Sequence, residues 1–377
     1  MCRVFSSRLN WNLAINRLSL LAAQKKHAGA PMIDLTESNP TLAGFEYPPE
    51  IAEALADRGA LRYSPSPRGL ESAREAVSEY YSGQIAPSRI LLTASTSEAY
   101  SYLFKLLADP GDEILTPRPS YPLFDYLASL ESVVTKQYPL RYDGSWHIDF
   151  DTLEKSVASR TRAIVVVNPN NPTGSFLKHS ESERLESLGV PLISDEVFSD
   201  YAFAPDPARV DSLAGPRRTL TFSMSGLSKI AGLPQMKLGW IVASGPGHEE
   251  ALDRLELIAD TYLSVSTPVQ IALPNLLAST VNEQIRHRTS ANLKFLRASA
   301  AGSPLQVLNV EGGWYATIQV PRVRSEEDWA LLLLDEHDVL VQPGFFFDFE
   351  SEAFLIVSLL TPPEVFAEGV RRILSAC

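Results

Sequence analysis

A lysine flanked by small residues is the first candidate for chemistry in this sequence. Lys229 follows Ser225-Gly226-Leu227-Ser228 and precedes a Gly-Leu-Pro break at 232–234. This setting leaves room for the side-chain amine to form a Schiff base with a carbonyl cofactor. A second cation, Lys237, comes eight residues later and is placed to meet an anion. Because a single lysine in a loop is usually a solvated lysine, its interpretation depends on the rest of the chain.

A second candidate site is a run of hydroxyl residues at a predicted helix start. The apolar run at 89–93 predicts a buried strand, and Ser95-Thr96-Ser97-Glu98 follows it. Ser95 with Glu98 makes a capping box that opens a helix. The first-turn amides and the hydroxyls of such a helix form a natural phosphate site. An ordinary capped helix is an equally good interpretation of this stretch taken alone.

Strand and helix patterns alternate through the middle of the chain, which predicts a mostly parallel sheet covered on both faces. Helical patterns lie at 121–131, 151–158 and 181–188. The candidate strands that follow the run at 89–93 are Glu113–Thr116, Val133–Tyr138, Ala163–Asn168, Pro191–Ser194, Thr219–Ser223 and Leu238–Ala243.

Polar residues follow several of these strands. They are Tyr121, the segment Asn168-Pro-Asn-Asn-Pro-Thr-Gly174, the segment Asp195-Glu-Val-Phe198, and the stretch that leads to Lys229. Ligands of parallel sheets bind at the carboxyl ends of the strands, so these residues are expected to share one site. An Asn-Pro bond at such a site is also a candidate for a cis peptide before Pro172.

The chain is long enough for two domains. We expect a large domain over 43–265 and a smaller α+β domain formed by 1–42 together with 266–377, with Ser-Thr-Pro 266–268 as the hinge. In the small domain the patterns predict helices at 10–27, about 269–300, about 326–336 and 363–375, and strands at 32–35, 306–310, 314–319, 339–342 and 354–360.

Composition excludes several classes of function. The net charge is -12 and no basic run occurs, which argues against nucleic acid or an anionic membrane as the main partner. Cys2 and Cys377 cannot form a disulfide framework, and no Cys/His cluster has metal-ligand spacing. Residues 1–30 lack the apolar core of a signal peptide, and no apolar run is long enough to span a membrane. A location in the reducing cytoplasm is the default expectation.

Taken together and in order, the motifs resemble the pyridoxal 5'-phosphate (PLP) dependent aminotransferases of class I and II, which have fold type I. The match runs from about residue 32 to the C-terminus. Its motifs are Tyr63-x5-Gly69, Ser95-Thr96-Ser97-Glu98-Ala99, Pro119-Ser120-Tyr121-Pro122, Asn168-Pro-Asn-Asn-Pro-Thr-Gly174, Asp195-Glu-Val-Phe198, Ser228-Lys229 and Lys237-x-Gly239.

The resemblance implies an α/β fold, with a large sheet domain and a smaller α+β domain, and PLP as the cofactor. The implied reaction moves an amino group between an amino acid or amine and a 2-oxo acid, through a Schiff base on Lys229. The same lysine would shuttle the proton during the reaction.

The resemblance also assigns cofactor contacts. Asp195 would pair with the pyridinium nitrogen, Asn171 would hydrogen-bond the phenolic oxygen, and Tyr121 would stack on the ring. The phosphate-binding residues would be Ser95, Thr96, Ser97 and Lys237, with Ser225 as an auxiliary because Gly226 stands where the family more often has serine.

Tyr63 resembles the tyrosine that reaches the phosphate of a neighbouring subunit. This resemblance implies a homodimer with shared active sites.

Three positions depart from the family pattern. Phe198 stands where a tyrosine usually donates to the phenolic oxygen, and Lys237 replaces the more usual arginine. Ile356 stands where an arginine usually clamps the substrate α-carboxylate.

The missing arginine leaves two interpretations open. Another cation takes the carboxylate, or the amino donor has no α-carboxylate. The substrate candidates are Ser38, Asn39 and Arg68; Arg322 and Arg324 are further cations, for which a solvated surface position is the simpler interpretation. The apolar residues Trp314, Tyr315, Phe345, Phe346 and Phe347 either line a pocket for a bulky substrate or form the core of the small domain.

Two other functions remain as alternatives to transamination. A PLP-dependent lyase or decarboxylase would use the same fold and cofactor site. A non-enzymatic PLP-binding regulator would need a DNA-binding module, and the chain has no basic helix-turn-helix pattern.

Overall fold

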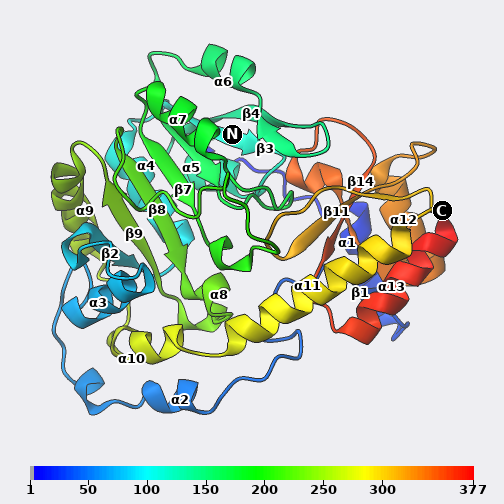
Figure 1. Cartoon of the computed structure of the whole chain (residues 1–377), viewed down its shortest axis with the longest axis horizontal. Coiled ribbons are helices and arrows are strands. Elements are labelled where there is room, and N and C mark those ends of the chain that lie inside the picture. The colour runs from blue at the N-terminus through cyan, green and yellow to red at the C-terminus, as the bar shows by residue number, and fades with distance from the viewer. Residues whose placement is uncertain (1–3) are drawn as a thin grey trace.

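The central element of the fold is an eight-stranded sheet with the strand order β2-β9-β8-β7-β6-β3-β4-β5. The computed structural model describes residues 4–377 (Figure 1). Neighbouring strands from β8 to β4 run parallel, whereas β9 runs antiparallel to both of its neighbours and β5 runs antiparallel to β4. The strands are β2 (Ile90–Thr93), β3 (Glu113–Arg118), β4 (Val134–Tyr142), β5 (Trp146–Ile148), β6 (Thr161–Val167), β7 (Leu192–Asp195), β8 (Thr221–Gly226) and β9 (Gly239–Ser244). The predicted α/β architecture with a mostly parallel sheet is confirmed.

Helices cover both faces of this sheet. The adjacent side chains of Leu91 and Leu92 point to opposite faces and enter different apolar cores, as strand geometry requires. One face packs against α4 (Thr96–Leu107), α5 (Phe124–Leu130) and α9 (His248–Tyr262). The other face packs against α6 (Phe150–Ser156) and α7 (His179–Ser187), and near β2 and β9 against α3 (Glu71–Tyr80) and α10 (Thr267–Leu277). Burial on both faces explains why the central strands are nearly continuous apolar runs.

The C-terminal part of the chain forms a second layer of structure beside the large sheet (Figure 1). Its four-stranded antiparallel sheet has the order β10-β11-β14-β13. The strands are β10 (Gln306–Val307), β11 (Tyr315–Gln319), β13 (Gln342–Pro343) and β14 (Phe354–Ser358), and the helices are α11 (Val281–Ala300), α12 (Glu326–His337) and α13 (Pro363–Ala376).

The N-terminal residues pack onto this C-terminal unit. Leu18 of α1 (Arg17–His27) lies in its apolar core, and β1 (Ile33–Asp34) pairs in parallel with β12 (Val339–Leu340). The Nζ of Lys25 donates to the Leu334 carbonyl at 2.6 Å. The division of the chain after residues 42 and 265 stays a prediction.

Two predicted helices differ in the structure. The helix expected at 10–27 begins only at Arg17, because the Asn16 side chain caps it by accepting from the Ser19 amide at 2.7 Å. The helix expected at about 269–300 is two helices, α10 and α11, separated at 278–280. α10 packs against α2 (Glu50–Ala54) and α3, so contacts to these helices override the continuous helical pattern.

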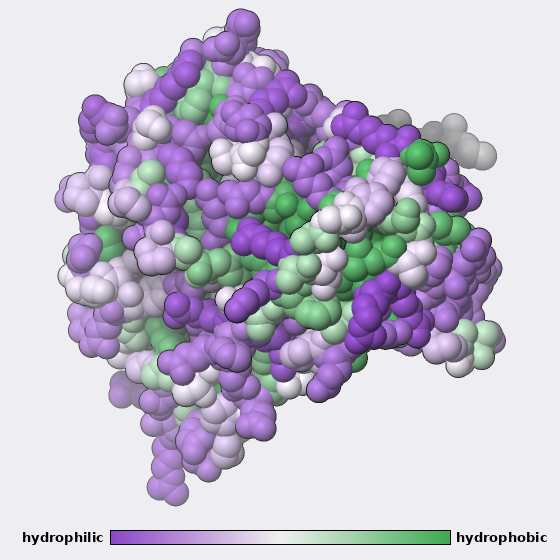
Figure 2. Space-filling view, turned by 45° about the vertical axis from the view of Figure 1, so that its right-hand side comes forward, coloured by the Kyte–Doolittle hydropathy of each residue, from purple (hydrophilic) through white to green (hydrophobic). Residues whose placement is uncertain are grey.

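The surface agrees with the composition of the chain. The face in Figure 2 is mostly hydrophilic, with hydrophobic residues gathered near its centre. Within residues 4–377, no helix has the length and apolar character needed to cross a membrane, and no group of three acidic, histidine or cysteine side chains is arranged to hold a metal ion. Cys2 lies outside the described residues, and Cys377 is a partly buried free thiol.

Candidate active site

A cavity of about 290 Å³ lies at the carboxyl ends of β6, β7 and β8. Most of the residues expected at the cofactor line it, although they come from separate elements. These residues are Ser95, Thr96, Ser97, Tyr121, Asn171, Asp195, Lys229 and Lys237, and the substrate candidate Ser38 lines it as well. The sheet topology brings them together, since parallel strands direct the loops after their carboxyl ends toward one edge.

Lys229 lies in α8 (Leu227–Ile230), a short helix that follows β8 directly. Its Nζ lies 5.1 Å from the ring centre of Trp314 and 6.0 Å from that of Phe198. Burial among these rings lowers the pKa of the Lys229 amine, and the charge of Asp195 offsets part of this effect. A lower pKa leaves more of the amine unprotonated and therefore nucleophilic.

Asp195 is the last residue of β7 and is buried beneath the cavity. Tyr100 donates to its Oδ2 at 3.0 Å, and the Val197 amide donates to its Oδ1 at 3.2 Å. Burial raises the pKa of Asp195 to about 6, against the opposing effect of these donors and of Lys229. A protonated ring nitrogen placed beside this carboxylate would favour its charged form, so Asp195 suits the predicted pyridinium contact.

The N-terminus of α4 supplies the expected anion site. Ser95 caps the helix by accepting from the Glu98 amide at 3.1 Å, while Glu98 accepts from the Ala94 amide at 2.6 Å. In a usual capping box the glutamate accepts from the amide of the N-cap residue, which here is Ser95. In this helix Glu98 accepts one residue earlier, from Ala94. The amides of the first turn remain at the cavity, where the helix dipole favours a phosphate.

Gly226 occupies the position where the family more often has serine, and the packing explains why. A Cβ atom on Gly226 would lie 2.9 Å from both the Gly239 Cα and the Leu238 carbonyl oxygen of the adjacent strand. Ser225 turns away and lies 3.4 Å from the Glu196 carbonyl, so its predicted auxiliary contact with the phosphate is not supported. Ser228 lines the cavity instead.

Asn171 provides the clearest sign that the cavity is built for a polar ligand. Its neighbour Asn170 is satisfied internally, because it donates to the Pro119 carbonyl and to Thr173, both at 2.9 Å. By contrast, the Oδ1 of Asn171 is buried and has no hydrogen-bond partner among residues 4–377. Because this atom belongs to a residue that lines the cavity, a ligand, an ion or a water molecule bound there could satisfy it. The Asn171–Pro172 bond is cis, as the sequence suggested.

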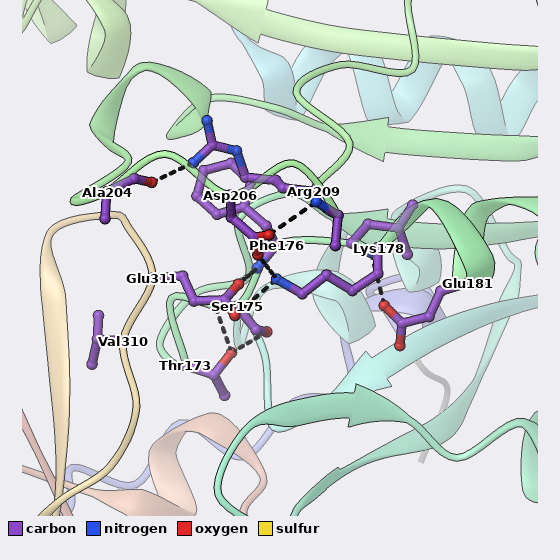
Figure 3. A network of polar contacts seen from close by, with 12 residues as sticks. Thr173, Ser175, Phe176, Lys178, Glu181, Ala204, Asp206, Arg209, Val310 and Glu311 are labelled. Carbon is purple, nitrogen blue, oxygen red and sulfur yellow. Dashed lines mark hydrogen bonds and ion pairs between the residues drawn. The ribbon is translucent and has the colours of Figure 1, made fainter.

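A segment of the C-terminal unit, Val310–Tyr315, leads to the cavity and ends at Tyr315, which lines it. Its Glu311 carboxylate accepts from the Phe176 amide at 2.8 Å and from the Lys178 Nζ at 2.9 Å. Figure 3 shows the Lys178 amine between the carboxylates of Glu311 and Asp206. Burial lowers the pKa of Lys178, but the hydrogen bonds to these two carboxylates raise it overall.

This anchored segment places two aromatic rings at the site. Trp314 packs edge-on against Phe198 with ring centres 5.3 Å apart, and Tyr315 lines the cavity. Phe347 belongs to the surrounding core, whereas Phe345 is partly exposed. Of the apolar residues expected to line a pocket or a core, only Tyr315 therefore reaches the cavity wall itself.

Three predicted site residues lie away from this cavity. Arg68 is paired with Asp253 at 2.8 Å and Glu256 at 2.6 Å on α9, and Asn39 accepts from the Thr41 amide at 3.0 Å. The structure thus gives no support within one chain for a substrate contact by either residue. Tyr63 is 78% exposed and lines a different surface pocket.

No cation replaces the missing arginine within the described chain. Ile356 is fully buried in the core, and its strand β14 carries no basic residue. Arg322 lines a separate pocket, and Arg324 lies over the Trp329 ring. In the described part of the chain, Lys229 and Lys237 are the only cations that line the cavity.

Sequence analysis missed Tyr100, which lines the cavity and donates to Asp195. The helical spacing contained a signal, because Tyr100 follows Thr96 by four residues and so shares its face of α4. Glu311 was also missed, and no local pattern marked it, because its partners lie more than a hundred residues away.

Comparison with known proteins decides the family. Residues 30–373 match the family described as Aminotransferase class I and II. The chain belongs to this family. It is 29% identical to human tyrosine aminotransferase over 94% of the chain and 82% of that protein. It is 25% identical to glutamate-pyruvate aminotransferase AlaA of Haemophilus influenzae, over 90% and 89% of the two chains. The structure of an alanine aminotransferase from Pyrococcus furiosus matches with a TM-score of 0.88 and 25% identity, and covers 99% of both chains.

Membership makes the chain a PLP-dependent aminotransferase, as its motifs indicated. Aminotransferases act on amino acids and 2-oxo acids. The similarity does not favour the lyase or decarboxylase alternative over transamination.

Proposed function

We propose that this aminotransferase binds PLP in the 290 Å³ cavity, through the amine of Lys229. The observation that carries the proposal is the convergence of four chemically distinct groups on one cavity. They are an amine of lowered pKa, a buried carboxylate, the side-chain amide of Asn171 with its Nδ2 donor, and a helix N-terminus. These groups match the carbonyl, ring nitrogen, phenolic oxygen and phosphate of a single cofactor.

Each residue at the cavity would have a separate role in the reaction. When bound, PLP would supply an electron sink that allows the substrate Cα to lose its proton. Lys229 Nζ takes that proton and later returns it, acting as the general base and then as the general acid. Asp195 holds a proton on the ring nitrogen, and Asn171 donates to the phenolic oxygen. Tyr121 covers a ring face and excludes water.

The phosphate would lie at the start of α4. The residues proposed to hold it are Ser95, Thr96, Ser97 and Lys237, which all line the cavity. Lys237 supplies a charge but not a two-pronged contact. Tyr63 is exposed on its own subunit, which supports the proposal that it completes the site of a partner in a homodimer.

We propose an α-amino acid as the amino donor and a 2-oxo acid as the acceptor, since relatives are named for such donors. The donor carboxylate would contact Ser38 at the cavity wall or a residue of the partner subunit. An amine donor without an α-carboxylate is the second candidate, because residues 4–377 offer no further cation at the cavity. A cytoplasmic location remains a prediction.

An absorbance experiment tests the proposal. PLP is added to the purified enzyme, then α-amino acids or simple amines, and finally a 2-oxo acid. Transamination predicts a visible band that is lost with the correct donor and returns with the acceptor. A response to amines alone selects the second candidate, and a deaminated or decarboxylated product without loss of the band indicates lyase chemistry. Lys229→Ala is the control, and an unchanged visible band in this variant contradicts the role of Lys229.

A further inference from the structure

The helix that carries Lys229 is too short to hold its own shape. α8 spans only Leu227–Ile230, and few backbone donors follow it: the Gly232 and Leu233 amides bond to the Lys229 and Leu227 carbonyls. A single helical turn is also unfavourable in isolation, because several dihedral angles are fixed for one hydrogen bond. Contacts from elsewhere in the protein are therefore needed to use the remaining acceptor capacity of its carbonyls and to fix the backbone.

Three side chains from distant parts of the sequence meet this need. Tyr201 donates its hydroxyl proton to the Lys229 carbonyl, and Asn282 donates from Nδ2 to the Ile230 carbonyl. Tyr47 donates to the Gly232 carbonyl at 2.8 Å. The three donors lie 28, 52 and 185 residues from their acceptors. They come from the 3₁₀ turn Ser199–Tyr201, the start of α11 and the segment before α2.

The packing around α8 is shaped to bring these donors close. Gly232 has a φ of +64°, and a Cβ atom there would lie 2.8 Å from side-chain carbons of Val281 and Ile285. Glycine thus allows α11 to lie directly against the loop after α8, which places Asn282 within reach of Ile230. Figure 1 shows α8 beside the start of α11.

Each donor is itself held in place. Asp200 is largely buried and accepts from Tyr80 at 2.8 Å and from Asn282 at 3.3 Å, so it orients the Asn282 amide. The Tyr201 ring packs edge-on against Trp314, with ring centres 5.3 Å apart. Trp314 in turn lies beside the Lys229 amine. Tyr201 thus contacts both the backbone of the lysine and the ring that lies beside its amine.

We propose that Tyr47, Tyr201 and Asn282 are positioning residues that together form a clamp on the backbone of α8 and fix where the amine of Lys229 enters the cavity. The inference rests on the proposed role of Lys229. The three donors do not line the cavity, so they hold the main chain and leave the side chain of Lys229 to move during the reaction. The clamp also joins this helix to the start of α11 and to the segment before α2, so displacement of either one changes the position of the amine.

The test uses the protein without added PLP, so that it does not depend on turnover. The variants are Tyr201→Phe, Asn282→Leu and Tyr47→Phe, which remove a donor and keep most of the side-chain volume. Tyr138→Phe is the matched control, because Tyr138 is also buried and donates to a backbone carbonyl, that of Val165, at 2.8 Å. It lies on β4 and belongs to a different apolar core from Leu227 and Ile230 of α8.

Two readouts separate positioning from general stabilisation. The first readout is the hydrogen-exchange rate of the Gly232 and Leu233 amides, which bond to the Lys229 and Leu227 carbonyls. Loss of one clamp donor should speed their exchange about tenfold, as expected for one buried hydrogen bond. Competitive labelling of lysines with acetic anhydride across pH gives the pKa of Lys229 itself. That pKa should rise toward the ordinary lysine value in the clamp variants, as water reaches the amine.

The control decides between the outcomes. Tyr138→Phe should lower global stability but leave both readouts at α8 unchanged. Clamp variants that behave like Tyr138→Phe in both readouts would overturn the proposal. If Tyr201→Phe fails to fold, the same two readouts on the more accessible Asn282 and Tyr47 variants decide whether the clamp exists. Failure of the wild-type enzyme to form a Lys229 adduct with PLP would refute the proposed function, while exchange and labelling would still test the clamp.

Discussion

Removing the negative charge of Asp195 should stabilise the protein in the absence of PLP, even though the charge is required for the proposed reaction. Burial raises the pKa of Asp195 from 3.8 to about 6 in the folded protein. A pKa that is higher in the folded than in the unfolded chain means that ionisation favours unfolding. The folded state of the wild type therefore loses stability as the pH rises from below about 4 through about 6.

The magnitude follows from the size of this shift. A shift of about 2 pH units corresponds to about 3 kcal/mol of unfolding free energy at pH 8. About half of this loss is already present at pH 5, because the unfolded carboxyl is ionised there and the folded one is mostly protonated. Asp195→Asn removes the titration while its side chain can still exchange hydrogen bonds with Tyr100 and the Val197 amide. Its stability advantage over wild type should thus grow by about 1.5 kcal/mol from pH 5 to pH 8.

Urea unfolding of the two proteins at pH 5, 6, 7 and 8, without PLP, measures this difference. Other buried acids such as Glu196 and Asp200 titrate equally in both proteins and cancel. Asp112→Asn is a control of opposite sign, since a hydrogen bond from Arg162 lowers the pKa of Asp112. That variant should be less stable than wild type by an amount that stays constant over this range. A constant difference for Asp195→Asn as well would refute the reasoning, because it would mean that Asp195 has no raised pKa.

Three further predictions concern the cofactor and the wall of the cavity. Phe198→Tyr should lower the pKa of the Lys229–PLP linkage, because an added hydroxyl stabilises the phenolic oxygen; a spectrophotometric titration that shows no fall contradicts this. Lys237→Met should weaken PLP binding about tenfold in an equilibrium titration, by loss of one charge-assisted contact, while Lys237→Arg should bind normally. Equal affinity of both variants would remove Lys237 from the phosphate site. Glu311→Gln should lower the unfolding free energy by about 1 to 2 kcal/mol, because Lys178 loses a charged acceptor; urea unfolding with unchanged stability would show that this ion pair is dispensable.

The sequence predicted the chemistry of the site because that chemistry is recorded in local motifs. Asp195 ends a strand, Lys229 and Asn171 come soon after strands, and parallel strands must bring such residues to one edge. The hydroxyl run Ser95–Ser97 indicated a capped helix, and the shifted return contact of Glu98 changed only a detail of that cap.

The sequence did not predict features that depend on contacts between distant residues. A periodic pattern extends across 278–280 in sequence, but packing of α10 on α2 and α3 splits it into two helices. Arg68 looked available as a substrate contact until the fold paired it with Asp253 and Glu256. A charge in a loop acquires its partner only when another element folds against it.

What the sequence by itself determined is the set of reactive groups, their order along the strands and the family to which they belong. Only the tertiary structure decided which groups share the cavity, how far burial moves the pKa values of Asp195 and Lys229, and which residues hold α8 in place. The physical reason is that reactivity belongs to a side chain, whereas burial, hydrogen-bond satisfaction and position depend on neighbours that are often far away in sequence. Tyr47 reaches across 185 residues to the loop after Lys229, and no local pattern records such a contact.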